Sequence, residues 1–153
     1  MAHLAKWLNE TNIQHLESVP TWQAAIEVVA APLLQEEAIT QQYVDAIIQQ
    51  KLDIGPYFVI APRIAMPHAR PEQGAKKLGL SVLKLAQGVN FDADENDPVD
   101  ILFMFAAPDS NSHIEMISQL AEVLSDEEKM AQVLRASTQA ELITLLLSDN
   151  PNS

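Results

Sequence analysis

The chain contains no cysteine and very little glycine, and both shortages restrict its chemistry. There are no cysteines and four glycines among 153 residues. The first absence excludes disulfides, thiolate catalysis and cysteine-ligated metal within this chain. The glycines are scattered, so no glycine-rich loop can cradle phosphates, and the Gly-x-x-x-x-Gly-Lys motif is missing. A nucleotide-dependent kinase is therefore disfavoured.

Basic residues are also scarce. Nine Lys and Arg face 21 Asp and Glu, which gives a formal net charge of −12 and a pI of about 4.5. Such a surface repels the phosphates of nucleic acids and the headgroups of anionic lipids. It attracts basic proteins, although solubility alone also accounts for the charge. We expect no nucleic-acid partner.

Long apolar runs are missing as well. No stretch approaches the ~20 apolar residues that span a bilayer, and the first ten residues lack the apolar run of a signal peptide. We therefore expect a cytoplasmic protein without direct membrane insertion. With 48% hydrophobic residues, the length fits one domain of ~100–150 residues with a real core. We expect a single domain over residues 1–153.

The apolar periodicity predicts helices, then strands, then helices. The first group of helices is expected over residues 3–9, 21–33 and 40–52, with Thr21 as an N-cap. Strands are expected over residues 13–19, 57–61, 63–66, 78–85 and 99–107. The last run is nearly continuously apolar, as is typical of a central strand covered on both faces.

Three capping patterns then predict the closing helices. Ser112, Ser125 and Thr138 are each followed three residues later by a glutamate, the signature of a capping box. The whole order of elements indicates an α/β or α+β sandwich around a mostly buried sheet.

Of the four histidines, His68 has the most suggestive position. It follows Pro67 at the expected end of a strand, where open α/β sheets place reacting groups. The plainer interpretation is a loop histidine with its hydrogen bonds satisfied. His3 and His15 lie near the N-terminus without a polar cluster, and we expect both at the surface.

His113 strengthens the case for a site. It falls in the first turn of the helix expected to begin at Ser112, directly after the central strand. A helix N-terminus offers free N–H groups and a partial positive charge, which suit a phosphate. If the strand ending near His68 lies beside the strand ending near Ala107, both histidines face one pocket, together with Arg70. A solvent-facing residue at the start of a helix is the alternative for His113.

Other classes of two-histidine site fit less well. A metal hydrolase needs carboxylates converging on the histidines, and the chain has no His-Glu-x-x-His motif. A serine hydrolase would need a Gly-x-Ser-x-Gly turn, which is absent. We expect no metal and no cofactor. Neutral imidazole is itself a nucleophile near pH 7, so a phosphoryl group on one histidine, held by the other, is a further candidate chemistry for this pocket.

Two stretches carry a family resemblance. Ile64-Ala-Met-Pro-His-Ala-Arg70 resembles the active-site segment of IIA proteins of the mannitol–fructose class of the phosphotransferase system (PTS). Residues 111–128 resemble the second histidine segment of that class. The resemblance covers about residues 10–148. Ascorbate-type IIA proteins look most similar, on residues 55–62, 65–74 and 96–102.

The resemblance implies both fold and function. It implies a PTS EIIA type-2 domain built as a three-layer α/β/α sandwich with a mixed, mostly buried β-sheet. It also implies that His68 accepts phosphate from phospho-HPr and passes it to a cysteine of a IIB component, which serves a membrane IIC permease for ascorbate or a related sugar or polyol. Two alternatives stay open: a regulatory IIA-like module that controls a partner protein, and a binding domain without chemistry.

The resemblance also suggests residue roles. His113 is expected to stabilise the phosphoryl group by hydrogen bonding. Supporting roles are expected for Arg70, Glu72 and Ser112. Mannitol-type members carry an arginine near the end of the helix before the active-site strand. Here the nearest cation is Lys51, and Arg63 is a further candidate for that charge.

Overall fold

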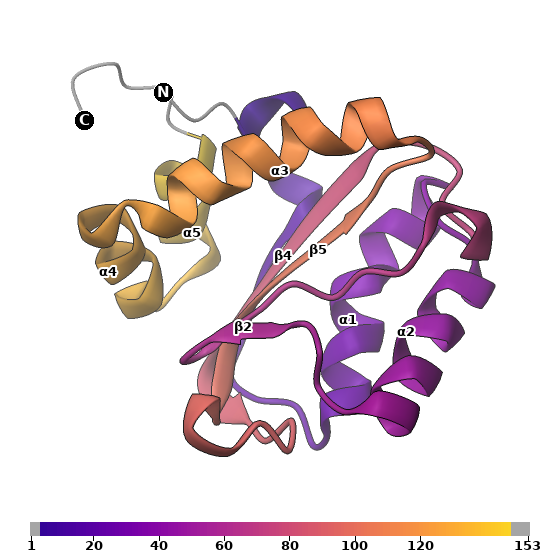
Figure 1. Cartoon of the computed structure of the whole chain (residues 1–153). Helices are drawn as coiled ribbons and strands as arrows, with labels where there is room; N and C mark the ends of the chain where they lie inside the picture. The colour runs from indigo at the N-terminus through magenta and orange to yellow at the C-terminus, as the bar shows by residue number, and fades with distance from the viewer. Residues whose placement is uncertain (1–3, 148–153) are drawn as a thin grey trace.

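In the computed structural model, which describes residues 4–147, a five-stranded sheet lies between two layers of helices (Figure 1). One layer consists of α1 (Trp22–Gln35) and α2 (Gln41–Ile54). The other consists of α3 (Ser110–Ser125), α4 (Glu127–Arg135) and α5 (Gln139–Leu147). The predicted α/β sandwich is therefore confirmed.

The sheet is mixed, and its strand order is β1-β4-β5-β3-β2. These strands are β1 (Ile13–Leu16), β4 (Gly79–Val89), β5 (Val99–Ala106), β3 (Ile64–Ala65) and β2 (Val59–Ala61). Parallel pairs join β1 to β4 and β3 to β5, whereas β4–β5 and β2–β3 are antiparallel. The parallel β3–β5 pair means that these two strands end at the same edge of the sheet.

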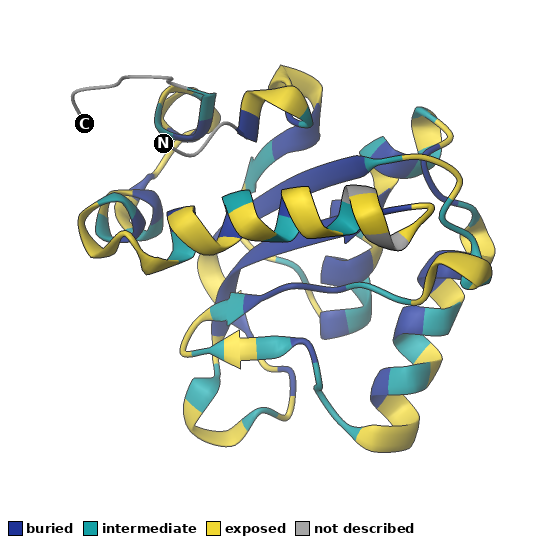
Figure 2. Cartoon of the chain, turned by 45° about the horizontal axis from the view of Figure 1, so that its top comes forward, coloured by how far each residue is buried: buried dark blue, intermediate teal, exposed yellow. Residues whose placement is uncertain are grey.

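The core lies on both faces of β4 and β5. All eight residues of β5 are buried, as predicted for a central strand. Leu102 and Met104 pack toward α1 and α2, while Phe103 and Phe105 pack toward the C-terminal helices. Figure 2 shows the central strands buried and the exposed positions on the outward faces of the helices. Each large apolar side chain buried in this way contributes roughly 1.5–3 kcal/mol.

The helix starts partly follow the predicted caps. Thr21 Oγ1 accepts a hydrogen bond from the Ala24 N–H at 3.1 Å, and Thr138 Oγ1 accepts one from Glu141 at 3.1 Å, so both caps are confirmed. The cap predicted at Ser125 is wrong, because Asp126, an equally favoured residue type, caps α4 one position later.

The cap predicted at Ser112 is also wrong. The helix begins at Ser110, directly after Asp109, which places Ser112 within the first turn. The side chain of Ser112 lies outside the described part of the chain. The earlier start has a simple cause, since Asp109 is itself a favoured capping residue type and lies three positions before Ser112.

The edge elements are shorter than predicted, and β4 is longer. Of the helix expected over residues 3–9, the described residues 4–9 form only the 3₁₀ turn Leu4–Lys6, and the strands expected over 57–61 and 63–66 shrink to β2 and β3. Further 3₁₀ turns are Glu10–Asn12, Pro71–Gln73 and Asp94–Asn96. No helix within residues 4–147 combines the length and apolarity needed to cross a bilayer.

His15 does not lie at the surface as predicted. It is half-buried on β1, against which α5 packs. Its Nε2 is buried and has no hydrogen-bond partner in the described structure. His3 lies outside the described residues.

Candidate functional site

A cavity of about 430 Å³ opens where β3 and β5 end. Its walls come from α2, Tyr57 ahead of β2, the segment that follows β3, the end of β5 and the start of α3. His68, Arg70 and His113 all line it, as does Gln50 from α2. The prediction that both histidines face one pocket with Arg70 is therefore confirmed, and its cause is the parallel pairing of β3 with β5.

The ring of His68 is held in one orientation. Its Nδ1 lies 2.8 Å from the Met66 carbonyl oxygen. Since a carbonyl only accepts, Nδ1 must carry the proton, and Nε2 keeps the lone pair. The ring stacks on Phe105, with centroids 4.7 Å apart and planes 19° from parallel. The edge of the ring that bears Nε2 is therefore the nucleophilic one.

Burial sets the charge of His68. Burial lowers the pKa of His68 below its ordinary value of 6.5 and is the largest contribution, because a buried imidazolium loses hydration. The Met66 carbonyl acts in the opposite direction, and the charge of His113 lowers the pKa further. His68 is therefore neutral at pH 7, which is the form that attacks an electrophile.

His113 reaches the same aromatic ring from α3. Its ring centroid lies 5.4 Å from that of Phe105, at an interplanar angle of 44°. The residue sits in the first turn of α3, where the helix dipole favours negative charge. Two imidazoles, one guanidinium side chain and a helix N-terminus thus surround one cavity, an arrangement suited to a phosphoryl group.

Residues 6–149 match the family described as "Phosphoenolpyruvate-dependent sugar phosphotransferase system, EIIA 2". The chain belongs to this family. It is a IIA component of the sugar phosphotransferase system, as the resemblance implied.

Individual relatives agree with this assignment. The IIA chain is 38% identical to the mannitol-specific cryptic phosphotransferase enzyme IIA component of Escherichia coli (strain K12), over 94% of this chain and 97% of the relative. It is 41% identical to the ascorbate-specific PTS system EIIA component of the same strain, over 82% of each chain. The solution structure of the cryptic mannitol-specific enzyme IIA from Escherichia coli superimposes with a TM-score of 0.90, at 38% identity, over 95% of this chain and 98% of that one.

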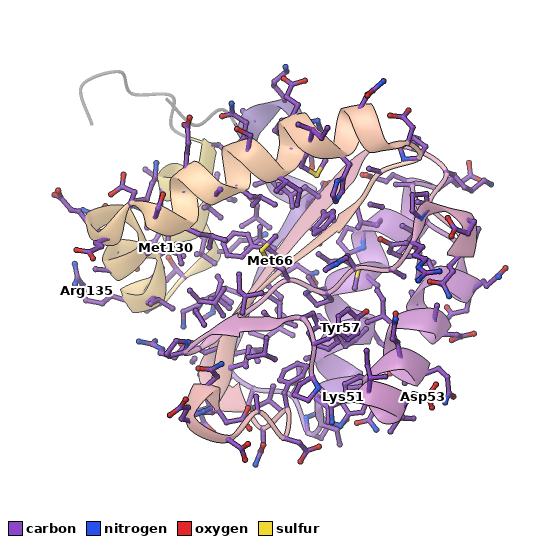
Figure 3. All side chains as sticks on the ribbon, in the orientation of Figure 1. Lys51, Asp53, Tyr57, Met66, Met130 and Arg135 are labelled. Atoms are coloured by element: carbon purple, nitrogen blue, oxygen red, sulfur yellow. The ribbon has the colours of Figure 1, made fainter. Side chains whose placement is uncertain are left out.

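Two tyrosines of this IIA protein hold the backbone around His68, and the sequence did not single them out. The Tyr57 hydroxyl donates to the His68 carbonyl at 2.5 Å. The Tyr43 hydroxyl accepts from the Ala69 N–H at 3.0 Å and donates to the Phe105 carbonyl at 2.9 Å. Figure 3 shows Tyr57 and Met66 between the layer formed by α1 and α2 and the layer formed by the C-terminal helices. Burial raises the pKa of each tyrosine to about 12, so both hydroxyls keep their protons.

Arg63 is not brought to the cavity. It precedes β3, at the other end of the strand from His68, and its guanidinium donates to both carboxylate oxygens of Asp100, at 2.9 and 2.6 Å. This hydrogen bonding raises the pKa of Arg63. Its positive charge is therefore paired with Asp100. The expectation that Arg63 supplies a positive charge to the cavity is not supported.

Lys51 and Glu72 also lie away from the cavity walls. Lys51 is buried near the end of α2 (Figure 3), where its Nζ pairs with Asp92 at 2.6 Å and lies 4.2 Å from the centroid of the Trp22 ring. Glu72 is exposed on the turn Pro71–Gln73 and does not line the cavity. The residues of α2 that do line it are Tyr43 and the neutral Gln50.

Proposed function

We propose that this IIA protein carries a phosphoryl group on Nε2 of His68. The observation that carries the proposal is the bond between Nδ1 and the Met66 carbonyl, which leaves Nε2 as the nucleophilic nitrogen of a residue that lines the same cavity as His113. The Nε2 lone pair forms a bond to phosphorus while the bond from phosphorus to the donor protein breaks. The electron pair of that broken bond returns to the donor.

The groups around the cavity stabilise the transferred charge. A loose transition state spreads negative charge over three equatorial oxygens, so fixed donors matter more than a base. His113 donates to a phosphoryl oxygen, and Arg70 supplies a positive charge at the same cavity. The first turn of α3, which includes Ser112, adds its backbone N–H groups. Glu72, exposed on the turn Pro71–Gln73, contacts a partner protein.

The donor is phospho-HPr and the acceptor is a cysteine of a IIB component, which feeds a membrane IIC permease from the cytoplasm. The acidic surface of this chain suits a basic donor protein. A solved complex of enzyme IIAMTL with phosphorylated enzyme IIBMTL from Escherichia coli supports the acceptor, since its chain matches this one at 25% identity with a TM-score of 0.74. The identity to the ascorbate-specific relative supports ascorbate, or a related sugar or polyol, as the transported compound.

Phosphate transfer from phospho-HPr tests the site. Wild type should be labelled on histidine, and His68→Ala should take up no label. His113→Ala should accept phosphate on the order of 10²–10³ times more slowly, as when one donor to a developing anion is lost. His15→Ala is the matched control, because His15 lies on β1, outside the cavity. Histidine labelling of His68→Ala would contradict the proposal.

Transfer from the labelled protein to purified IIB components tests the partner. We expect faster transfer to an ascorbate-type IIB than to a mannitol-type IIB. The reverse order would overturn the assignment to ascorbate. Labelling on His68 without transfer to either IIB would instead favour the regulatory module.

A further inference from the structure

The chain leaves the sheet just before His68. Strand β3 pairs in parallel with β5 at two positions, Ile64 beside Ile101 and Ala65 beside Leu102. Continuing this register would place Ala69 beside Ala106, with the Ala69 N–H directed at the carbonyl of the preceding residue, Phe105. That ladder bond is not made directly.

The hydroxyl of Tyr43 occupies the place of the missing bond. It accepts from the Ala69 N–H at 3.0 Å and lies 2.9 Å from the Phe105 carbonyl oxygen. The Ala69 carbonyl is farther from the hydroxyl, at 3.2 Å, so the shorter contact favours Phe105 as the acceptor of the single proton. Two hydrogen bonds in series thus replace one, and the segment after β3 is held away from β5 at a fixed spacing.

Tyr43 is well placed to keep that spacing constant. It is 1% exposed and comes from α2, which packs on the sheet face toward α1. A buried tyrosine ring has few rotamers open to it, and its hydroxyl is satisfied on both sides. A second hydroxyl, that of Tyr57, binds the neighbouring His68 carbonyl at 2.5 Å.

Phe105 connects this spacing to the imidazole. Its carbonyl accepts from Tyr43, while its ring stacks on His68. The Tyr43 hydroxyl therefore fixes the position of the backbone next to His68 relative to Phe105, the same residue whose ring supports the imidazole. We propose that Tyr43 is a positioning residue for His68, whose hydroxyl acts as a spacer between the end of β3 and β5. This inference rests on the proposed function of His68.

The test is Tyr43→Phe, which keeps the buried ring and removes the spacer. The rate constant kcat for phosphate acceptance from phospho-HPr should fall on the order of tenfold to a hundredfold, as for a misplaced reacting group. KM for phospho-HPr should stay unchanged, because Tyr43 is 1% exposed and so presents almost no surface to a docking protein. The ¹⁵N shifts of the His68 ring in the unphosphorylated protein should change, because its geometry to Met66 and Phe105 changes.

Ile47→Val is the matched control, since Ile47 lies one turn further along α2 and is fully buried in the same core. It should lower stability while leaving kcat and the His68 shifts as in wild type. Wild-type kcat in Tyr43→Phe, or an equal loss in Ile47→Val, would overturn the inference. If Tyr43→Phe does not fold, Tyr57→Phe frees the same segment from its other side, and wild-type kcat in that variant would likewise overturn it.

The two proposals fail in different ways. A wild-type protein that takes no phosphate on histidine refutes the proposed function. The ring shifts are measured without phosphorylation, so an altered His68 signal in Tyr43→Phe supports the positioning role even then. Unaltered shifts refute that role alone.

Discussion

Asp100 holds together a buried cluster of charges at the start of β5. Asp100 is 6% exposed and Lys84, on the neighbouring strand β4, is 3% exposed. Lys84 Nζ lies 3.0 Å from Asp100 Oδ2 and also donates to the Leu85 carbonyl. Replacing Asp100 by Asn keeps the shape of the side chain, so the change in stability reports the lost charge rather than a cavity.

The size of the effect follows from this geometry. Two unit charges 3.0 Å apart attract by about 5.5 kcal/mol at an effective dielectric constant of 20. The Arg63 side chain is 46% exposed, so solvent screens its pairing with Asp100, which adds only about 0–1 kcal/mol. In Asp100→Asn the Lys84 ammonium stays buried and keeps only neutral oxygens as partners, the Leu85 carbonyl and the new side-chain amide. We expect the free energy of unfolding to fall by about 3–5 kcal/mol.

Urea unfolding at pH 7 measures this loss, and thermal unfolding should show Tm lowered by roughly 6–20 °C. The matched control is Asp45→Asn, because Asp45 is exposed on α2 and accepts a hydrogen bond from Gln41. That control should change stability by less than about 0.5 kcal/mol. Adding Lys84→Met to Asp100→Asn should recover part of the loss, since the unpaired charge is removed. An Asp100→Asn protein within about 1 kcal/mol of wild type, or a double variant no more stable than the single one, would refute the reasoning.

Three further predictions concern the site and the helix caps. Because folding lowers the pKa of His68, the unfolded chain binds more protons at this residue than the folded chain does. The contribution of neutral His68 to stability is therefore full above about pH 6.5 and is lost as the pH falls through the folded pKa. The free energy of unfolding of His68→Gln, measured in urea from pH 7.5 to 5, should vary less with pH than that of wild type. Phe105→Leu keeps an apolar side chain but removes the stacked ring, and initial rates of phosphate acceptance should fall on the order of tenfold; an unchanged rate would count against the role of the ring. Thr21→Ala should lower the free energy of unfolding in urea by about 1 kcal/mol, because Thr21 caps α1. Thr40→Ala should lower it by less, since Thr40 Oγ1 has no hydrogen-bond partner in the described structure. Equal losses in the two variants would contradict this prediction.

The elements with strong local signals were predictable. The apolar run that became β5 is buried on both faces, and the Thr21 cap marks the start of α1 within one residue. The meeting of His68 and His113 was predictable too, because both follow strands that turned out to be parallel neighbours. The start of α3 was missed because the sequence offers two capping residues in succession, Asp109 and Ser112, and periodicity does not choose between them.

Roles that depend on distant backbone groups were not predictable. Tyr43 falls within the helix expected over residues 40–52, and nothing local marks it as special, because its hydroxyl partners lie 26 and 62 residues further along the chain. Lys51 was a candidate because it is the cation nearest the helix position where mannitol-type members carry an arginine, and Arg63 because it directly precedes the motif. Their carboxylate partners, Asp92 and Asp100, come from elsewhere in the chain and fix them outside the cavity. The local sequence shows that a residue is charged, but it does not show which residue forms an ion pair with it.

The bond between Met66 and Nδ1 of His68 has a kinetic consequence. It occupies one nitrogen of the ring, and Phe105 covers a face, so a group joins and leaves His68 by way of the same atom, Nε2. In the proposed function, a donor and an acceptor that both need this atom must visit in turn, and no ternary complex transfers phosphate. Steady-state rates measured against both proteins should therefore give the parallel double-reciprocal lines of a ping-pong scheme.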